Sequence, residues 1–230
     1  MEQRAAEQFG GKTTLSLTDQ LVDGKLVVQQ GIIAGCAGGM YDNIAEAAAI
    51  LSGGDVGCGP FSLSVYPPSI PVNLELMQNG VQQALLEAGV LFKPCFCGPC
   101  FGAGDVPANN ALSVRHTTRN FPNREGSKPG DGQLSGVLLM DARSIAATAR
   151  NHGVVTSAAD VDYPAPAPVR RTFDGGVYGR RVYFGYGKAQ PEDPPSTTAP
   201  TLPSGPPCPR WGGAAAAGGL RAAGPRHHHR

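Results

Sequence analysis

Half of the cysteines in this chain lie within one short segment. Residues 93–102 read Lys-Pro-Cys-Phe-Cys-Gly-Pro-Cys-Phe-Gly, so that Cys95, Cys97 and Cys100 occupy three of six consecutive positions. The segment follows a short apolar run at 89–92 that is typical of a strand ending at a turn. A Cys-x-x-Cys pair at a strand end holds two thiolates close together, an arrangement that suits iron or zinc. The pair by itself is compatible with a redox dithiol, a zinc site or part of an iron–sulfur site.

A further cysteine, Cys36, lies in a glycine-rich turn. Residues 25–34 end in a β-branched run suited to a buried strand, 35–39 read Gly-Cys-Ala-Gly-Gly, and 41–51 favour a helix. Cys36 is therefore expected close to a helix N-terminus, where exposed amides stabilise a thiolate or another anion. A small buried thiol in a tight turn explains the pattern equally well. Cys58, in a loop, is interpreted as a spare thiol.

The rest of the chain predicts the elements that position these cysteines. Ser69 is a candidate N-cap and Pro71 fits the first turn of a helix over about 70–88, and Asp141 is the candidate N-cap of a later helix. Apolar runs predict strands at 61–66, 90–92, from 112 onwards, and 136–140. Strands that alternate with helices through short connections predict an α/β fold, a three-layer α/β/α sandwich with a mainly parallel sheet. Cys36 and the cysteine segment then lie at carboxyl ends of strands, where such sheets bind ligands.

An arginine-rich loop follows the strand that starts near 112. Its Arg119 and Arg124 are candidates for binding a carboxylate or phosphate, because a guanidinium offers a planar fork of donors. A solvated polar loop is the alternative interpretation. His116, at the start of the loop, is expected to be structural rather than a ligand.

Bulk properties exclude several classes of protein. A formal net charge of +1 over 230 residues leaves no basic footprint for nucleic acid. The sequence shows neither a signal peptide nor an apolar run of membrane-spanning length, so a cytoplasmic protein is expected. In that compartment, clustered cysteines are more often metal-binding or catalytic than disulfide-bonded.

Composition divides the chain into four segments. We expect a lead-in over residues 1–24, an α/β domain over 25–163, and an extended linker and arm over 164–193, where alternating aromatics suggest a hairpin or a docking arm. Residues 194–230 are rich in proline and glycine and contain no acidic residue, which predicts a disordered tail. The abrupt change in composition is also typical of out-of-frame translation.

Taken in order, these motifs resemble the aconitase family of iron–sulfur hydro-lyases. That family places one cluster-ligating cysteine after a strand-end glycine, as at Gly35 and Cys36, and two more in a Cys-Gly-Pro-Cys pair about sixty residues downstream, as at 97–100. A loop of the form Arg-Asn-Phe-x-x-Arg follows, as at 119–124. The resemblance covers about residues 25–163 and corresponds to the third domain of the family, in an uncharacterised bacterial hydratase branch.

The resemblance implies a cofactor and a reaction. A [4Fe-4S] cluster would be held by Cys36, Cys97 and Cys100, with Cys95 a non-ligand neighbour. The open fourth iron would act as a Lewis acid in the reversible dehydration of a small hydroxy-di- or tricarboxylic acid. Arg119 and Arg124 would bind carboxylates of that substrate.

The sequence also departs from the family pattern. Ala37-Gly38-Gly39 replaces the usual Thr-Asn-Ser, Thr118 replaces an asparagine, and Asn123 replaces a glycine, so a substrate other than citrate is expected. The three other domains of the family, which carry the catalytic serine and further substrate-binding groups, have no counterpart here. We therefore expect an enzyme fragment that is inactive by itself, unless another chain supplies those domains.

Two other classes remain open. A zinc-binding structural module could use Cys36, Cys95, Cys97 and Cys100. A redox protein could use the Cys-Gly-Pro-Cys pair, but thioredoxin-like folds continue that pair into a long helix. The glycines and the proline of residues 101–107 interrupt any such helix. The metal content of the purified protein separates the three classes.

Overall fold

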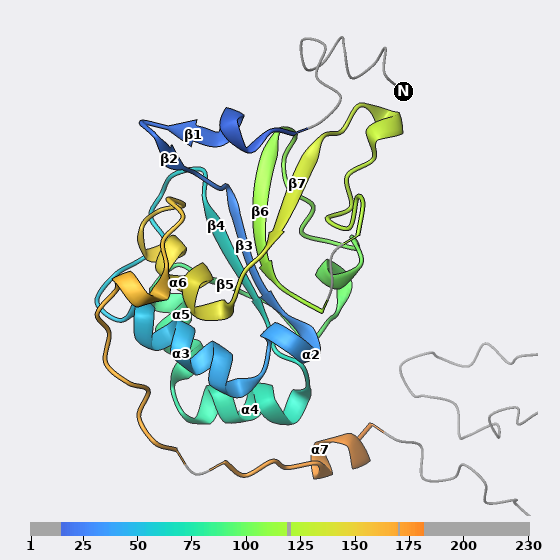
Figure 1. Ribbon diagram of the computed structural model, residues 1–230. Coiled ribbons are helices and arrows are strands. Elements are labelled where there is room, and N and C mark those ends of the chain that lie inside the picture. Colours follow the sequence, from blue (N-terminus) through green and yellow to red (C-terminus); the bar gives the residue numbers. More distant parts are fainter. Residues whose placement is uncertain (1–14, 119–120, 170, 182–230) are drawn as a thin grey trace, which may run out of the picture. The chain divides into compact units, whose positions relative to one another are not determined.

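The fold is centred on a parallel β-sheet (Figure 1). The computed structural model describes residues 15–118, 121–169 and 171–181. The chain divides into two units, Met1–Val177 and Tyr178–Arg230, of which the second is described only over 178–181. The sheet has the strand order β5-β4-β3-β6-β7, and every neighbouring pair is parallel. Its strands are β3 (Gln30–Ala34), β4 (Ser62–Tyr66), β5 (Leu91–Phe92), β6 (Ala111–His116) and β7 (Ser135–Leu139). The predicted α/β fold with a mainly parallel sheet is confirmed.

Four helices form one layer against this sheet. They are α3 (Tyr41–Leu51), α4 (Ile70–Gln78), α5 (Val81–Glu87) and α6 (Ala142–Arg150), and they contact one another in a continuous layer. Both predicted N-caps are confirmed. The Ser69 hydroxyl accepts a hydrogen bond from the Val72 amide, and the Asp141 carboxylate accepts bonds from the amides of Arg143 and Ser144.

The single helix predicted over 70–88 is a pair of helices. The helix breaks at Asn79 and Gly80, where Gly80 has a left-handed φ of 72° and starts the second helix. The apolar spacing of the sequence continues across this break, which is why the pattern alone predicted one long helix.

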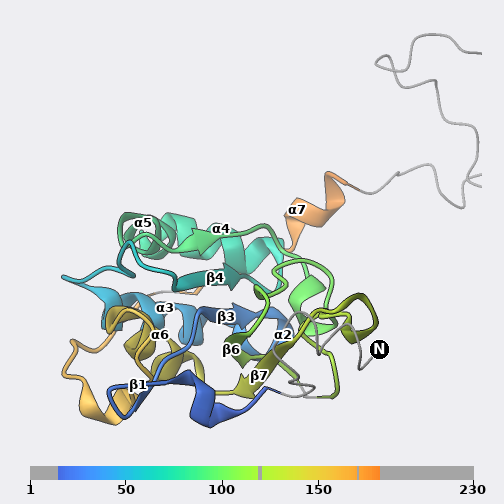
Figure 2. The same cartoon turned by 90° about the horizontal axis from the view of Figure 1, so that it is seen from above.

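The two faces of the sheet are covered in different ways. Ile33, Leu63 and Val114 join the main apolar cluster with residues of the helix layer. Ile32, Ala34 and Tyr66, which alternate with them along the strands, form a separate small cluster. Seen from above, α3 and α6 lie on one side of the strands and much of the green connections on the other (Figure 2). The second outer layer therefore consists of connections that carry the short 3-10 helices η2 (Gly98–Cys100) and η3 (Pro129–Asp131).

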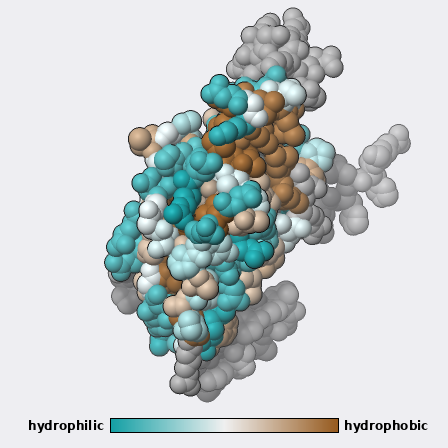
Figure 3. Space-filling view, turned by 60° about the vertical axis from the view of Figure 1, so that its left-hand side comes forward, coloured by the Kyte–Doolittle hydropathy of each residue, from teal (hydrophilic) through white to brown (hydrophobic). Residues whose placement is uncertain are grey.

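A small antiparallel ribbon precedes the sheet. It consists of β1 (Leu21–Val22) and β2 (Lys25–Leu26) after the 3-10 helix η1 (Leu17–Gln20), whereas an edge strand or an irregular segment was predicted around 13–17. Leu17, Leu21 and Val22 are about half exposed. Apolar surface gathers in the upper part of the face shown in Figure 3, at the height of this ribbon in Figure 1. The patch lies at the amino ends of the strands, opposite to Cys36.

The remaining described elements are short. They are η4 (Ala158–Asp160) and α7 (Gly176–Gly179), and α7 is helical where a hairpin or docking arm was predicted. The rest of that arm and the predicted disordered tail, with Cys208, lie outside the described residues. None of the described helices is long and apolar enough to span a membrane. The predicted domain boundaries stay predictions.

Candidate functional site

The strand β3 delivers Cys36 to the carboxyl edge of the sheet. It ends at Ala34 and passes directly into the four-residue helix α2 (Gly35–Gly38). Gly35 has a left-handed φ of 68°, and a Cβ atom there would lie 3.1 Å from the Cys100 Sγ and 3.2 Å from the Cys97 Sγ. The two sulfurs of the Cys-Gly-Pro-Cys pair are therefore packed against the residue that precedes Cys36. Residues separated by about sixty positions meet because parallel strands end at the same edge.

The two cysteines of the pair have different environments. Cys100 is buried at the end of η2, whereas Cys97 is exposed. Burial, a hydrogen bond with Cys97 and the nearby charges of Cys97 and Cys36 raise the pKa of the Cys100 thiol to about 11, against the lowering effect of Arg124. These electrostatic interactions place Cys36, Cys97 and Arg124 around Cys100. A thiolate at Cys100 thus requires a positive partner.

The other described cysteines lie elsewhere. Cys95 is half-buried in the connection before η2, and Cys58 is exposed in the loop before β4, at the opposite end of the strands. Within the described ranges, no group of three or more His, Cys, Asp and Glu side chains is arranged to hold a single metal ion. The sulfurs of Cys97 and Cys100 therefore form a pair, to which Cys36 is the nearby third thiol.

Arg124 is buried without a polar partner. Its side chain is 0% exposed, and its three nitrogen atoms accept no pairing from any group in the described part of the chain. The guanidinium carbon lies 5.6 Å from the centre of the Phe121 ring. The adjacent Glu125 carboxylate instead accepts hydrogen bonds from Ser127 and Ser135. An unpaired buried guanidinium is unfavourable, so Arg124 is poised for an anion that is not part of the described chain.

Two loops meet at a pair of glycines. A Cβ atom on Gly102 would lie 2.7 Å from the Gly126 Cα, so only glycine allows this approach of the backbones. Gly102 follows the cysteine pair and Gly126 follows Arg124. Their contact brings the cysteine loop and the arginine loop together, as the sequence predicted for a shared site. Arg119, the other predicted anion-binding residue, lies outside the described residues.

His116 has a structural role, as expected. Its Nδ1 atom accepts a hydrogen bond from the Ala142 amide at 3.1 Å, at the start of α6. Burial lowers the pKa of this imidazole, against the raising effect of Asp141. The carbonyl oxygen of His116 also closes the space beside Gly38, and that of Tyr66 closes the space beside Gly39. Side chains at 38 and 39, such as those usual in the family, would collide with these carbonyl groups.

The sequence analysis did not identify one buried polar network beside the cysteines. Arg115 is 0% exposed and donates to the carbonyl oxygens of Pro99 and Asp105, while Gln30 and Ser113 support it. The available signal was polar residues at alternate positions of strands that otherwise read as buried, namely Gln30, Ser113 and Arg115. Such a pattern indicates that one face of the sheet is covered by polar groups.

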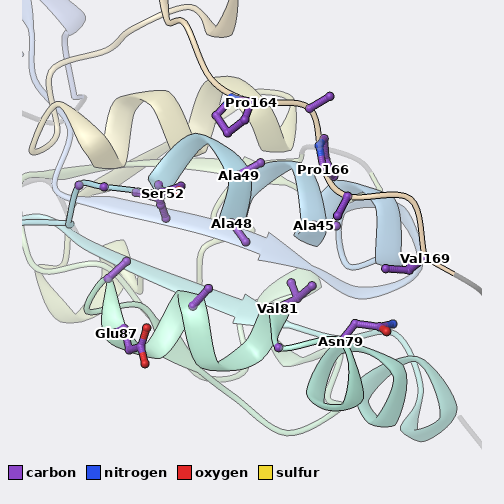
Figure 4. Close-up of a pocket in the computed structure, with 18 of the residues that line it drawn as sticks. Ala45, Ala48, Ala49, Ser52, Asn79, Val81, Glu87, Pro164, Pro166 and Val169 are labelled. Atoms are coloured by element: carbon purple, nitrogen blue, oxygen red, sulfur yellow. The ribbon is translucent and has the colours of Figure 1, made fainter.

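A separate hollow of about 440 Å³ lies away from the cysteines (Figure 4). It runs between α3, α5 and residues 164–169, and it is lined mostly by small side chains such as Ala45, Ala48 and Val81. Among the described residues that line it, Glu87 is the only charged one. Because it offers few groups for chemistry, the cysteine end of the sheet remains the candidate site.

Comparison with known proteins adds an independent observation. The model of the aconitase family (aconitate hydratase) matches residues 2–147. The 3-isopropylmalate dehydratase large subunit 1 of Methanopyrus kandleri is 31% identical over 146 residues, which are 63% of this chain and 34% of that protein. The large subunit of Nitratidesulfovibrio vulgaris (strain DP4) is 32% identical over 125 residues, 52% of this chain and 29% of that protein.

A third relative, the 3-isopropylmalate dehydratase large subunit 2 of Pyrococcus furiosus, is 34% identical over 113 residues, 47% of this chain and 28% of that protein. The chain thus spans about a third of the length of these curated relatives. The matched region contains β3 to β7 and therefore both cysteine elements and the arginine loop. Since the family model covers more than half of the sequence, the chain belongs to the aconitase family.

Proposed function

We propose that this chain is the cluster-binding part of a hydro-lyase and that Cys36, Cys97 and Cys100 hold a [4Fe-4S] cluster. The observation that carries the proposal is the position of the Cys97 and Cys100 sulfurs, 3.2 and 3.1 Å from where a Cβ of Gly35 would lie, directly beside Cys36. Membership of the aconitase family supports a hydro-lyase type of reaction.

The residues at the site fit such a group. Thiolates are the ligands of iron–sulfur clusters, and each iron takes its own cysteine, so three sulfurs need not converge on a single point. This accounts for a thiol set that does not form a ready site for one metal ion among the described residues. A cluster with three thiolates is anionic, and the buried charge of Arg124 lies close enough to Cys100 to favour its ionised form.

The chain's own residues also prepare a place for substrate. When bound, the cluster would supply a Lewis-acidic iron for the hydroxyl and carboxylate of a small hydroxy acid. Arg124 has three nitrogen atoms free of partners in the described ranges, and its planar fork suits a carboxylate. We propose that Arg124, together with Arg119, orients that carboxylate. The glycines at 38 and 39 leave this edge lined by backbone rather than by side chains.

Complete turnover requires groups that this site lacks in its described part. Dehydration needs a base that removes a proton from carbon, and such acid–base assistance contributes typically ~10²–10⁴-fold. The curated relatives are about three times as long as the matched region, and their names describe a large subunit. We propose that the remaining groups come from another polypeptide, and that the chain alone turns over no hydroxy acid.

One observation favours a second function. Cys97 is exposed and Cys100 is buried with a raised pKa, and the two side chains are hydrogen-bonded. An exposed and a buried thiol in one Cys-x-x-Cys pair also suit a dithiol that forms a reversible disulfide. In that case Cys36 would be dispensable, and the purified protein would contain no iron.

Anaerobic reconstitution with iron and sulfide tests the proposal. We expect broad visible absorption and bound iron with labile sulfide, which Cys36→Ser, Cys97→Ser and Cys100→Ser each reduce sharply. Cys95→Ser is the matched control in the same loop and should reconstitute normally. Damage from Cys95→Ser with a silent Cys97→Ser would refute the ligand assignment. A stoichiometric zinc ion without sulfide would instead support the structural module.

A further inference from the structure

Arg115 makes hydrogen bonds with all three of its nitrogen atoms. Nε donates to the Ser113 hydroxyl at 2.9 Å, Nη1 to the Pro99 carbonyl at 2.9 Å, and Nη2 to the Gln30 side-chain oxygen and the Asp105 carbonyl, both at 3.0 Å. The side chain is completely buried, and burial lowers its pKa to about 10, so it stays protonated at neutral pH. A buried cation with this many bonds is held in one position.

The acceptors around Arg115 are themselves fixed. The Ser113 hydroxyl donates to the Gln30 side-chain oxygen at 2.7 Å, and the Gln30 amide donates to the Asp105 carbonyl at 3.0 Å. The Tyr66 hydroxyl donates to the Asp105 carboxylate at 2.7 Å. The network therefore joins three adjacent strands, β3, β4 and β6, to one connection.

That connection carries the cysteine pair. The turn closes on itself through bonds from the Cys100 amide to the Cys97 carbonyl and from the amides of Phe101 and Ala103 to the Gly98 carbonyl. The two carbonyl oxygens that bind Arg115 belong to Pro99, between the cysteines, and to Asp105, at the end of the loop. Arg115 thus links the closed turn to the sheet at two points.

We propose that Arg115 is a positioning residue that fixes the Cys97–Cys100 turn on the sheet and thereby keeps the two sulfurs against Gly35. It touches neither sulfur nor substrate in this arrangement, and its action is exerted through the Pro99 carbonyl. The effect on iron binding rests on the proposed function, whereas the effect on the turn itself does not.

Geometry, rather than charge alone, explains the choice of arginine. The four acceptors are neutral oxygens in fixed directions, and a guanidinium offers donors on all sides of one plane. A lysine retains the charge but cannot reach both carbonyls and both side chains. Arg115→Lys therefore separates a positioning role from a purely electrostatic one.

Amide hydrogen exchange of the cluster-free chain is the primary test. In Arg115→Lys we expect amides in residues 97–106 to exchange on the order of tenfold or more faster, because a bond to a charged donor is lost at each end of the turn. Ser113→Ala is a milder variant that removes one support of Arg115 and should show a smaller change of the same kind. Arg150→Lys is the matched control, since Arg150 binds the Ile50 carbonyl at 2.8 Å on the helix side.

The outcomes divide clearly. Faster exchange confined to 97–106 in Arg115→Lys and Ser113→Ala supports the proposal, and unchanged exchange there, or equal acceleration in α3, overturns it. In reconstituted protein, iron transfer to a chelator should be correspondingly faster in Arg115→Lys. If the unaltered chain binds no iron while the turn still loosens in the variants, the positioning role stands and the proposed function fails.

Discussion

Along each central strand, successive side chains enter two different environments. Ile33, Leu63 and Val114 face a layer of helices and share one apolar cluster with them. Gln30, Ser113 and Arg115 face connections and share a buried hydrogen-bond network. The strands are the same, so the difference arises from what covers each face.

The comparison shows a division of labour within one sheet. The helix side satisfies itself, because apolar side chains need only close packing. The connection side includes a guanidinium with no partner in the described ranges, Arg124, and a thiol whose ionisation is disfavoured, Cys100. Residues that are unsatisfied in the folded chain commonly mark functional sites.

The largest expected effect comes from the helix side. Leu63 is completely buried, and Leu63→Ala should lower the free energy of unfolding by about 2–5 kcal/mol through lost burial and a cavity. The measurement is urea unfolding of the cluster-free chain. Ser64→Ala, one residue further and on the other face, should change stability by only about 1 kcal/mol. Iron uptake at low temperature should be unaffected by Leu63→Ala, and equal losses in both variants would contradict the division between the faces.

Substitution of Arg124 should have the opposite sign. Arg124→Met removes three buried nitrogens without partners while it retains the length of the side chain, so the cluster-free chain should gain about 1–3 kcal/mol in unfolding free energy. The same variant should retain less iron, because the positive charge beside Cys100 is lost. Arg143→Met, at an exposed arginine, is the control and should shift stability by no more than about 0.5 kcal/mol. A loss of stability in Arg124→Met would reveal a structural partner for the guanidinium.

The smallest effect is expected at His116, where β6 leaves the sheet toward α6. Its folded pKa is lowered, so the unfolded chain binds this proton more readily. The contribution of His116 to stability is therefore complete above the unfolded pKa of about 6.5 and is lost as the pH falls through the folded pKa. Urea unfolding at pH 7.5 and 5.5 should show a smaller decrease for His116→Gln than for the unaltered chain.

Glutamine can still accept the bond from the Ala142 amide, which makes His116→Gln a conservative change. The facing carboxylate, Asp141, also has a lowered pKa and adds to the loss of stability in acid, but it is common to both chains. His152→Gln, at an exposed imidazole, is the matched control. Identical pH dependence in all three chains would refute the contribution of His116.

Much of the fold follows from local patterns. The helix at 41–51 has the predicted bounds, the caps at Ser69 and Asp141 are as predicted, and the strands match their apolar runs to within a few residues. These features depend on side-chain periodicity and on hydrogen bonds between near neighbours, which a sequence displays directly. The break at Gly80 was missed because a single glycine within continuous apolar spacing is compatible with an unbroken helix.

For the site, the sequence by itself determined which residue types are present, their order and the family they belong to. Cys36, Cys97, Cys100 and Arg124 were identified from spacing alone, whereas their use as ligands and in anion binding stays a prediction. Only the tertiary structure decided which of these groups lie together, which are buried, and that Arg115 holds the cysteine turn. The physical reason is that burial and hydrogen-bond partners depend on strand order and on the path of long connections. Those are set by contacts between residues far apart in the chain, and no local pattern records them.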